Sequence, residues 1–458
     1  MTLSKAADHA REFLDSLDSR SIAPIANVSD LRSALFKPLN DAGLPADEVI
    51  DDLVRDTRDG LLGSTSGRFF GWVIGGVLPV TLAADWLTSA WDQNAAIYAT
   101  SPAAAAVEEV CGEWLKSLLG LPASASFGLL TGTQSAHTVA LAAARNKLLI
   151  ERGWDVNTKG LMGAPRMRIL TGAHRHESVL RSIRLLGLGT EALEIVDVDA
   201  SGRIRLDSLK VALQAGENEP AVVCLQAGDL NAGVFDPFTE AGRIAHDAGA
   251  WVHVDGAFGL WAGASEHNRY LVEGVGAADS WATDCHKWLN VPFDSGFVFV
   301  ADPEAHKSAL TQDASYTIKV EETRDQMEWN LEWSRRSRGF TVYAALRNLG
   351  RSGVAELVER CCGHAHRLVT EIGDLDGAHV LAEPQINQGL VQFTSNEGNH
   401  DRRTDEVIAK IVASGEAWFG GTTWNGIRAM RVSVCNWRTT DEDVDRAIAC
   451  VRGILAGV

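Results

Sequence analysis

Two ionisable residues stand where the sequence predicts apolar surroundings. Asp255 ends the apolar run 251–255, and a carboxylate at a buried strand end is costly unless a cation meets it. Lys287 stands next to Trp288, and burial lowers the pKa of an amine from its usual value of about 10.4, so that such a lysine can form a Schiff base. Each residue also has an ordinary interpretation, Asp255 as a turn residue before Gly256 and Lys287 as a lysine whose amine reaches solvent.

A candidate anion site precedes a helical stretch. Gly132, Thr133 and Gln134 lead into an Ala-rich segment that predicts a helix over 134–152. The backbone N–H groups and the positive end of the helix dipole attract an anion such as a phosphate to a helix start. A simply capped helix with no ligand is the competing interpretation.

Two histidines, His174 and His176, follow the apolar run 167–171. Either imidazole could cover the face of a flat ring. A histidine pair could also bind a metal ion, but no third ligand with a suitable spacing is near, so we predict no metal site.

Taken together, these residues describe one site with a phosphate cradle, a ring-covering histidine, a carboxylate and an amine. That combination matches the demands of pyridoxal 5'-phosphate, whose phosphate favours a helix N-terminus, whose ring nitrogen favours an aspartate and whose aldehyde favours a lysine. The sequence therefore predicts a pyridoxal phosphate site.

Short apolar runs alternate with helical stretches through the middle of the chain. The predicted strands are 167–171, 193–198, 221–226, 251–255, 280–282 and 296–300. The predicted helices are 134–152, 177–186, 206–215 and 238–248. This alternation favours an α/β fold with a mostly parallel, doubly wound sheet, in which ligands bind at the carboxyl ends of the strands.

Three regions are predicted along the chain. Residues 1–65 form a polar N-terminal helical segment, and 66–338 form the large α/β domain. A polar, charged loop near 312–335 ends that domain, and 339–458 form a small C-terminal α+β domain.

Composition excludes several classes of protein. Among the 458 residues, 46% are hydrophobic and 22% are charged, which is typical of a globular protein and not of a disordered one. The formal net charge of -18 disfavours nucleic acid and anionic membrane surfaces as partners. The seven cysteines form no CxxC pair, and no signal peptide or 20-residue apolar span is visible, so we expect a cytoplasmic protein with reduced thiols.

The motif His253-Val254-Asp255-Gly256-Ala257, followed by Asp284-Cys285-His286-Lys287-Trp288, resembles the signature of the group II pyridoxal-phosphate-dependent amino-acid decarboxylases. Further matches in the family's order extend the resemblance over most of the chain: Arg68-Phe69-Phe70-Gly71, Ala143-Ala144-Arg145, His176-Glu177-Ser178 and Arg431-Val432-Ser433-Val434. The resemblance implies a fold-type I homodimer with active sites at the subunit interface and an N-terminal dimerisation segment that wraps the partner.

The resemblance also implies a role for each motif residue. Lys287 would hold the internal aldimine, and Asp255 would pair with the ring nitrogen. His176 would stack on one face of the ring and Ala257 would close the other. The remaining cofactor contacts would come from Gly132, Thr133, Gln134 and His286, around the phosphate.

The implied reaction is decarboxylation of an L-amino acid to an amine through a quinonoid intermediate, with His176 or Tyr316 returning the proton. Two departures from the family pattern matter. Asp284 stands where an asparagine is common, so its extra negative charge needs a compensating donor. No tyrosine lies between Tyr316 and Tyr343, where the family usually has a loop tyrosine. An aldehyde synthase, a carbon–carbon lyase or a transaminase-like enzyme therefore stays open, as does an inactive dimeric scaffold.

The substrate side chain is not determined by the sequence. The aromatic segment 69–98 fits an apolar or aromatic substrate pocket, but it fits a buried dimer interface slightly better.

Overall fold

The computed structural model describes residues 2–312, 320 and 323–457, which form two compact units. One unit contains 77–363 and 384–388, and the other contains the chain's beginning up to 76, together with 364–383 and the stretch from 389 onward. The assignment of a dimerisation segment, a cofactor-binding domain and a small domain to particular residue ranges stays a prediction.

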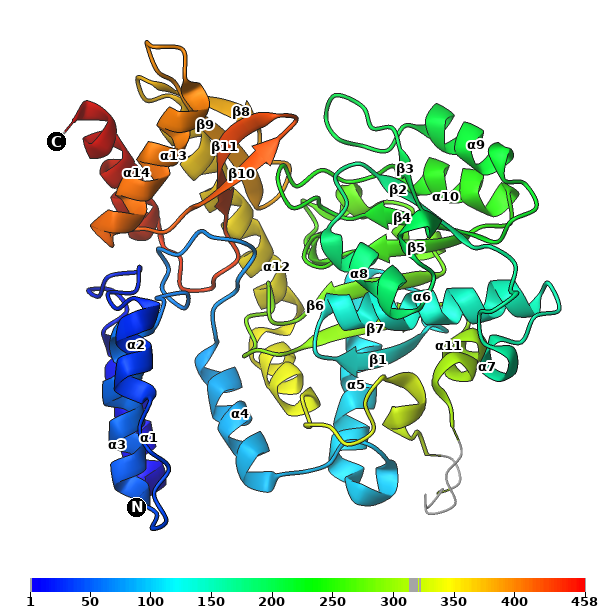
Figure 1. The fold of residues 1–458 in the computed structure, drawn as a ribbon, viewed down its shortest axis with the longest axis horizontal. Helices are drawn as coiled ribbons and strands as arrows, with labels where there is room; N and C mark the ends of the chain where they lie inside the picture. The colour runs from blue at the N-terminus through cyan, green and yellow to red at the C-terminus, as the bar shows by residue number, and fades with distance from the viewer. Residues whose placement is uncertain (1, 313–319, 321–322, 458) are drawn as a thin grey trace. The chain divides into compact units, whose positions relative to one another are not determined.

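The larger unit is built on a seven-stranded sheet of order β1-β7-β6-β5-β4-β2-β3 (Figure 1). Its strands are β1 (Ser126–Leu130), β2 (Arg168–Gly172), β3 (Leu193–Val196), β4 (Ala221–Gln226), β5 (Trp251–Asp255), β6 (Ser280–Asp284) and β7 (Gly296–Val300). Strands β3, β2, β4, β5 and β6 pair in parallel, whereas β7 is antiparallel to both β6 and β1. The predicted mostly parallel sheet is confirmed, and β1 is a strand that the sequence analysis did not predict.

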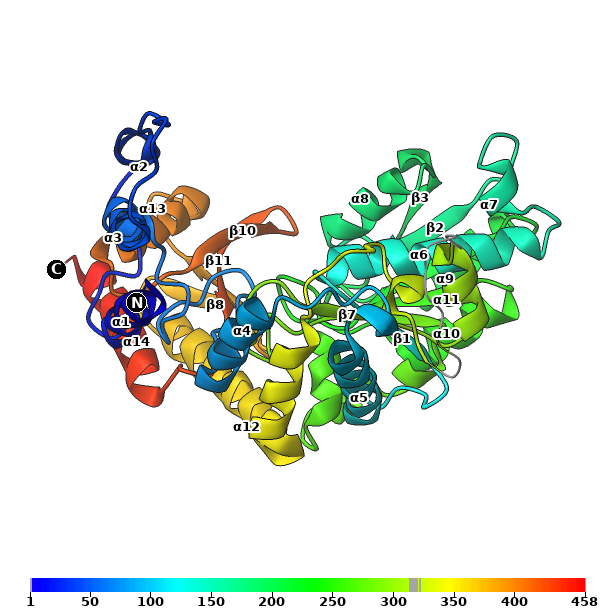
Figure 2. The ribbon, with the colours of Figure 1, turned by 90° about the horizontal axis from the view of Figure 1, so that it is seen from below.

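Helices cover both faces of this sheet. The helices of the larger unit include α4 (Pro79–Trp91), α5 (Pro102–Leu119), α6 (Thr133–Ile150), α7 (Val156–Lys159), α8 (Glu177–Leu185), α9 (Leu206–Ala215), α10 (Phe238–Asp247) and α11 (Pro303–Leu310). Figure 2 shows α6 on one side of the sheet and α5 and α10 on the other. Fully buried alanines, among them Ala140, Ala143 and Ala144, let α6 lie close to the strands because their side chains are short.

The carboxyl ends of β5 and β6 lie at the same edge of the sheet. Asp255 pairs in register with Ala282, so β6 runs two residues beyond the end of β5. The turns that follow β4 and β5 pack tightly here, since a Cβ atom added at Gly259 would lie 2.0 Å from the carbonyl oxygen of Ala227. This edge is where the sequence predicted the ligand site.

The smaller unit combines helices with a four-stranded sheet of order β10-β11-β9-β8, which confirms the predicted C-terminal α+β part of the fold. The strands are β8 (Ala378–Ala382), β9 (Gln388–Phe393), β10 (Gly420–Trp424) and β11 (Ile427–Ser433). The helices are α1 (Thr2–Asp15), α2 (Val28–Leu35), α3 (Ala46–Thr57), α13 (His400–Ser414) and α14 (Asp441–Ala456). A long helix, α12 (Gly339–Gly373), belongs partly to each unit and is broken at Gly350, whose φ is 61°.

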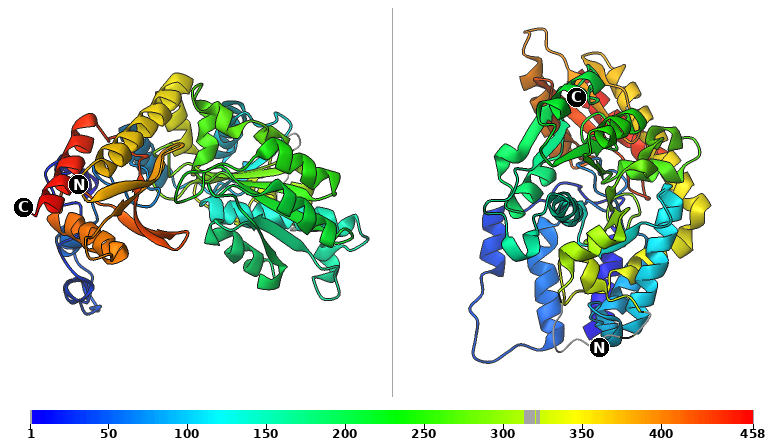
Figure 3. Two further views of the ribbon diagram at one scale, coloured as in Figure 1. Left: turned by 90° about the horizontal axis from the view of Figure 1, so that it is seen from above. Right: turned by 90° about the vertical axis from the view of Figure 1, so that its right-hand side faces the viewer.

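Aromatic pairs form part of the core of the smaller unit. The rings of Phe69 and Trp418 stack with centroids 5.0 Å apart, as do those of Phe70 and Phe419. The connection between α2 and α3, residues 36–45, is an open loop in the right-hand view of Figure 3. Within the part of the chain that the structure describes, no helix is both long enough and apolar enough to cross a bilayer.

Candidate active site

Asp255 is buried at the end of β5, with both carboxylate oxygens facing donors. Oδ1 accepts the backbone N–H of Ala257 at 3.2 Å, and Oδ2 lies 3.4 Å from Nε2 of His137 on α6. Burial would raise the pKa of this carboxyl group, but the neighbouring His137, His176 and Lys287 together outweigh burial and lower it. Asp255 is therefore an anion at neutral pH and suits a cationic ring nitrogen.

Lys287 follows β6, and its amine is held by a second buried carboxylate. Nζ lies 2.9 Å from Oδ2 of Asp284, and Oδ1 of Asp284 accepts the backbone N–H of Thr133 at 2.6 Å. Burial of Asp284 opposes its ionisation, yet Lys287 and His286 lower its pKa overall. The compensating donors that the sequence analysis required for Asp284 are thus Lys287 and the first residue of α6.

The start of α6 forms a polar cradle from Gly132, Thr133 and Gln134. The hydroxyl Oγ1 of Thr133 is buried and has no hydrogen-bond partner among the described residues. A Cβ atom added at Gly132 would lie 3.0 Å from Cε1 of His286 and 3.1 Å from Oδ1 of Asp284, so a larger residue here would press on both side chains. A buried, unpartnered hydroxyl at a helix N-terminus fits a phosphate oxygen.

His286 contributes a second donor to this cradle. Its Nδ1 accepts the backbone N–H of Ser295 at 3.1 Å, and burial lowers the pKa of the imidazole. The neutral ring therefore carries its proton on Nε2, which lies 3.7 Å from Oδ1 of Asp284. An N–H on this edge suits an anion bound at the start of α6.

His176 caps the N-terminus of α8, which fixes the direction of its ring. Nδ1 accepts the backbone N–H of Ser178 at 3.2 Å, so Nε2 on the opposite edge is left for a ligand. Although the side chain is exposed to solvent, the surrounding protein lowers its pKa by desolvation; Asp255 opposes this effect and Lys287 adds to it. His176, Asp255 and Lys287 thus lie close enough to one another to interact electrostatically.

The predicted site residues of the larger unit are thus brought to one edge of its sheet. The group comprises Gly132, Thr133, Gln134, His176, Asp255, Ala257, His286 and Lys287. Their donors, carboxylates and amine fit pyridoxal phosphate, although their individual roles stay predictions. The predicted Tyr316 lies outside the described residues, so the structure says nothing of it.

One functional candidate, His137, was missed by the sequence analysis. It lies one helical turn beyond Thr133 on α6, and the i, i+4 spacing places both residues on the same face. The i, i+4 spacing from Thr133 could have pointed to His137, but it does not reveal that His137 lies next to Asp255.

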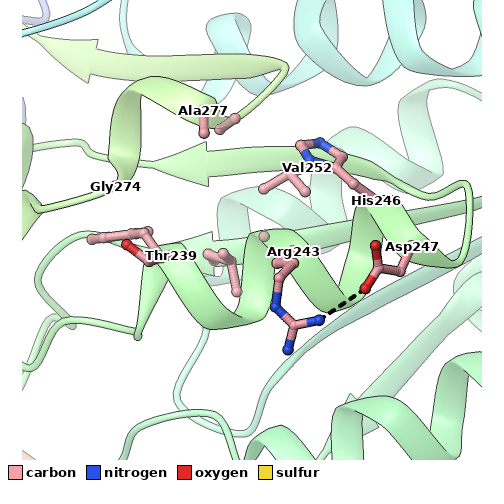
Figure 4. Close-up of a pocket in the computed structure, with 11 residues that line it drawn as sticks. Thr239, Arg243, His246, Asp247, Val252, Gly274 and Ala277 are labelled. Carbon is pink, nitrogen blue, oxygen red and sulfur yellow. Dashed lines mark hydrogen bonds and ion pairs between the residues drawn. The ribbon is translucent and has the colours of Figure 1, made fainter.

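A cavity of about 270 Å³ lies elsewhere in the larger unit (Figure 4). Its lining includes Thr239, Arg243 and His246 of α10 and Val252 of β5, and it includes none of the predicted site residues. Arg243 is paired there with Asp247 at 2.9 Å. This cavity is separate from the candidate active site.

Comparison with known proteins gives a consistent result. The family model described as the pyridoxal-dependent decarboxylase conserved domain matches residues 30–396. Among curated proteins, the 4-hydroxyphenylacetaldehyde synthase of Rhodiola rosea is 24% identical over 96% of this chain and 91% of its own length. The acidic amino acid decarboxylase of Bos taurus is 29% identical over 78% of this chain and 69% of its own length.

A solved structure shows the same fold. The crystal structure of Oryza sativa TDC with PLP and tryptamine superposes with a TM-score of 0.93 and 22% sequence identity, and the match covers 100% of this chain and 97% of that one.

Proposed function

Because this chain belongs to the pyridoxal-dependent decarboxylase family, we propose that its site at the ends of β5 and β6 converts an L-amino acid to an amine and carbon dioxide. The protein is accordingly a carboxy-lyase that uses pyridoxal 5'-phosphate. When bound, this cofactor supplies an electron-poor ring that accepts the electrons of the breaking bond to the α-carboxylate.

The observation that carries the proposal is the placement of opposite charges at one sheet edge. Asp255 ends β5, and Lys287 follows the end of the adjacent parallel strand β6. Burial raises the pKa of Asp255, but His137, His176 and Lys287 lower it overall. The start of α6 is next to both, since Thr133 and Lys287 share Asp284. One flat molecule with an aldehyde, a ring nitrogen and a phosphate satisfies all three groups.

We assign the roles as follows. Lys287 holds the cofactor through its amine, and Asp255 keeps the ring nitrogen protonated. His176 covers one face of the ring and Ala257 the other. Because burial lowers the pKa of His176, its neutral imidazole carries a proton on Nε2, which can be delivered to the substrate's α-carbon after carbon dioxide leaves.

The phosphate site is assigned to the start of α6. Gly132, Thr133 and Gln134 supply the helix terminus, the free hydroxyl of Thr133 donates to a phosphate oxygen, and His286 donates through Nε2. Tyr316, proposed from the sequence alone, stays the alternative to His176 as the proton donor.

We further propose that the protein acts as a cytoplasmic homodimer with active sites at the subunit interface. Helices α1, α2 and α3 bury no residue, and their surroundings expose large apolar side chains: Ile25 at 78%, Phe36 at 92% and Leu39 at 103%. A second copy that covers them would remove this surface from water. All seven cysteines are free, which agrees with a reducing compartment.

The reaction is tested by incubating the protein, reconstituted with pyridoxal phosphate, with each common L-amino acid and with diaminobutyrate. We expect equal amounts of amine and carbon dioxide from one group of substrates and none from Lys287→Ala. Borohydride reduction followed by peptide mapping should label Lys287. An unlabelled Lys287, or cofactor binding with no product from any amino acid, would overturn the proposal; the unlabelled lysine is the result expected of an inactive scaffold.

A second candidate is an aldehyde synthase, which the absence of any tyrosine between Tyr316 and Tyr343 favours. The similarity to a 4-hydroxyphenylacetaldehyde synthase points the same way. This reaction consumes the amino acid, oxygen and water and yields aldehyde, carbon dioxide, ammonia and hydrogen peroxide. Oxygen uptake with peroxide in place of amine would identify it. A carbon–carbon lyase that leaves the carboxylate in place, or a transaminase-like enzyme, would release no carbon dioxide.

A further inference from the structure

A line of buried polar contacts leads from Asp255 into the sheet. Nε2 of His137 lies 3.4 Å from Oδ2 of Asp255, an ion-pair contact outside hydrogen-bond geometry, and Nδ1 of His137 lies 2.8 Å from Nε2 of His253. Nδ1 of His253 lies 2.9 Å from the hydroxyl of Ser280, which accepts the indole N–H of Trp251 at 2.8 Å. The two histidines and Ser280 have no exposed surface, so water cannot substitute for any link.

The donors and acceptors in this line fit a direction that ends at Asp255. The indole nitrogen of Trp251 can only donate, so Ser280 accepts from it and has its own proton to give. His253 is the other hydrogen-bonding partner of that hydroxyl, and a donated proton occupies its Nδ1 lone pair. His253 then carries its ring proton on Nε2 and donates it to Nδ1 of His137.

We propose that His137 is a positioning residue whose Nε2–H, oriented by the chain Trp251, Ser280 and His253, points at Asp255 and holds that carboxylate ionised and in place for the cofactor ring. The opposite direction would place the lone pair of a neutral His137 against a carboxylate, which is repulsive. Burial lowers the pKa of His253 to about 3, which agrees with a neutral ring at this point in the chain.

Other charged groups near Asp255 come from two further elements. His176 stands at the start of α8, and Asp284 and Lys287 stand at and beyond the end of β6. None of these hydrogen-bonds to His137 or His253 within the described residues. The orientation of His137 is therefore set by the chain and not by the ligand-facing groups.

The line of contacts from Trp251 to Asp255 exists in the protein without any cofactor, whereas its effect on the cofactor rests on the proposed function. Two measurements therefore test the line of contacts and the cofactor effect separately. The first is the ¹⁵N chemical shift of the ring nitrogens in histidine-labelled, cofactor-free protein, with signals assigned through His137→Gln and His253→Gln. We expect the proton of His253 on Nε2 and a proton on Nε2 of His137 facing Asp255. A His137 that carries its proton on Nδ1, with none on Nε2, would overturn the proposal.

The second measurement is the pH midpoint of the visible absorbance band of the reconstituted protein. In His137→Gln the Asp255 carboxylate is held in place less firmly, so it stabilises less positive charge on the cofactor ring. The nitrogen that joins the cofactor to Lys287 then holds its proton more tightly. The midpoint should rise by roughly one pH unit, and in Ser280→Ala it should rise by less.

The matched control is His306→Gln, which also removes a fully buried imidazole. His306 lies on α11 and contacts Ser126 and the carbonyl of Trp329, away from the site. The pH midpoint of the visible band in His306→Gln should equal that of the unmodified protein. If the midpoint in His137→Gln also equals that of the unmodified protein, the proposal is overturned. If neither the unmodified protein nor any variant shows a visible band, the proposed function fails. The ¹⁵N measurement on the cofactor-free protein then still tests the orientation of His137.

Discussion

The amine of Lys287 and the backbone N–H of Thr133 bind the two oxygens of one carboxylate, that of Asp284, at 2.9 and 2.6 Å. Asp284 thereby joins the lysine to the start of α6. It also places a buried negative charge beside the predicted phosphate cradle. In the protein without a cofactor, the amine of Lys287 and the N-terminus of α6 together offset the negative charge of Asp284.

Asp284→Asn should tighten the binding of pyridoxal phosphate. The amide oxygen can still accept the N–H of Thr133, but the like charge next to the phosphate is removed. We expect a dissociation constant lower by about fivefold, which corresponds to about 1 kcal/mol. Absorbance titration of cofactor-stripped protein measures it. Pyridoxal without the phosphate is the comparison ligand, and an equal gain for that ligand would place the effect at Lys287 and not at the cradle.

Asp255→Asn should slow decarboxylation strongly while leaving the fold intact. A neutral amide cannot stabilise a positive charge that develops on the ring, and loss of such a preorganised charge costs about 100-fold or more in kcat. Amine release under saturating substrate gives the rate. A visible band that persists after reconstitution would show that the cofactor still binds, and an undiminished kcat would refute the assigned role.

The free energy of unfolding should fall between pH 7.5 and 5.5 because of buried histidines. Burial lowers the pKa of His306 to about 3, whereas an unfolded histidine titrates near pH 6.5. Over this window the unfolded chain binds the extra proton, so stability is lost as the pH falls, by about 1.3 kcal/mol for each such histidine. His253 has the same lowered pKa of about 3 and adds a similar loss.

His306→Gln isolates this contribution in urea unfolding curves measured at the two pH values. The variant should lose less stability on acidification, by about the contribution of one histidine. Asp236 acts in the opposite direction, since burial raises its pKa to about 6 and its uptake of a proton stabilises the folded state below that pH. Because Asp236 is present in both proteins, its effect cancels. An unchanged pH dependence in the variant would contradict the prediction.

Glu108→Gln should destabilise the larger unit. Nη2 of Arg335 donates to both carboxylate oxygens of Glu108 on α5, at 2.7 and 2.5 Å, and both side chains are almost completely buried. Removing one charge leaves the other uncompensated, which costs about 3–5 kcal/mol. The exposed pair Arg243–Asp247 provides the control, and Arg243→Ala should change the unfolding midpoint little. Equal unfolding midpoints for Glu108→Gln and Arg243→Ala would show that the buried pair stabilises the fold no more than the exposed pair does.

The sequence by itself determined the fold class and the main chemistry of the site. Short apolar runs gave strands whose bounds match β4, β5 and β7, because strands buried on both faces are apolar along their whole length. The types and positions of Asp255 and Lys287 at strand ends predicted a pyridoxal phosphate site, since parallel strands bring their carboxyl ends together.

Only the tertiary structure decided which distant side chains meet. His137 and His253 are 116 residues apart, Thr133 and Asp284 are 151 apart, and Glu108 and Arg335 are 227 apart. Such pairs depend on the strand order β7-β6-β5-β4 and on how α6 crosses it, which no local pattern encodes. The reversed strand β7 beside β1 was hidden for the same reason: a buried strand reads alike in either direction, and its neighbours fix which one it takes.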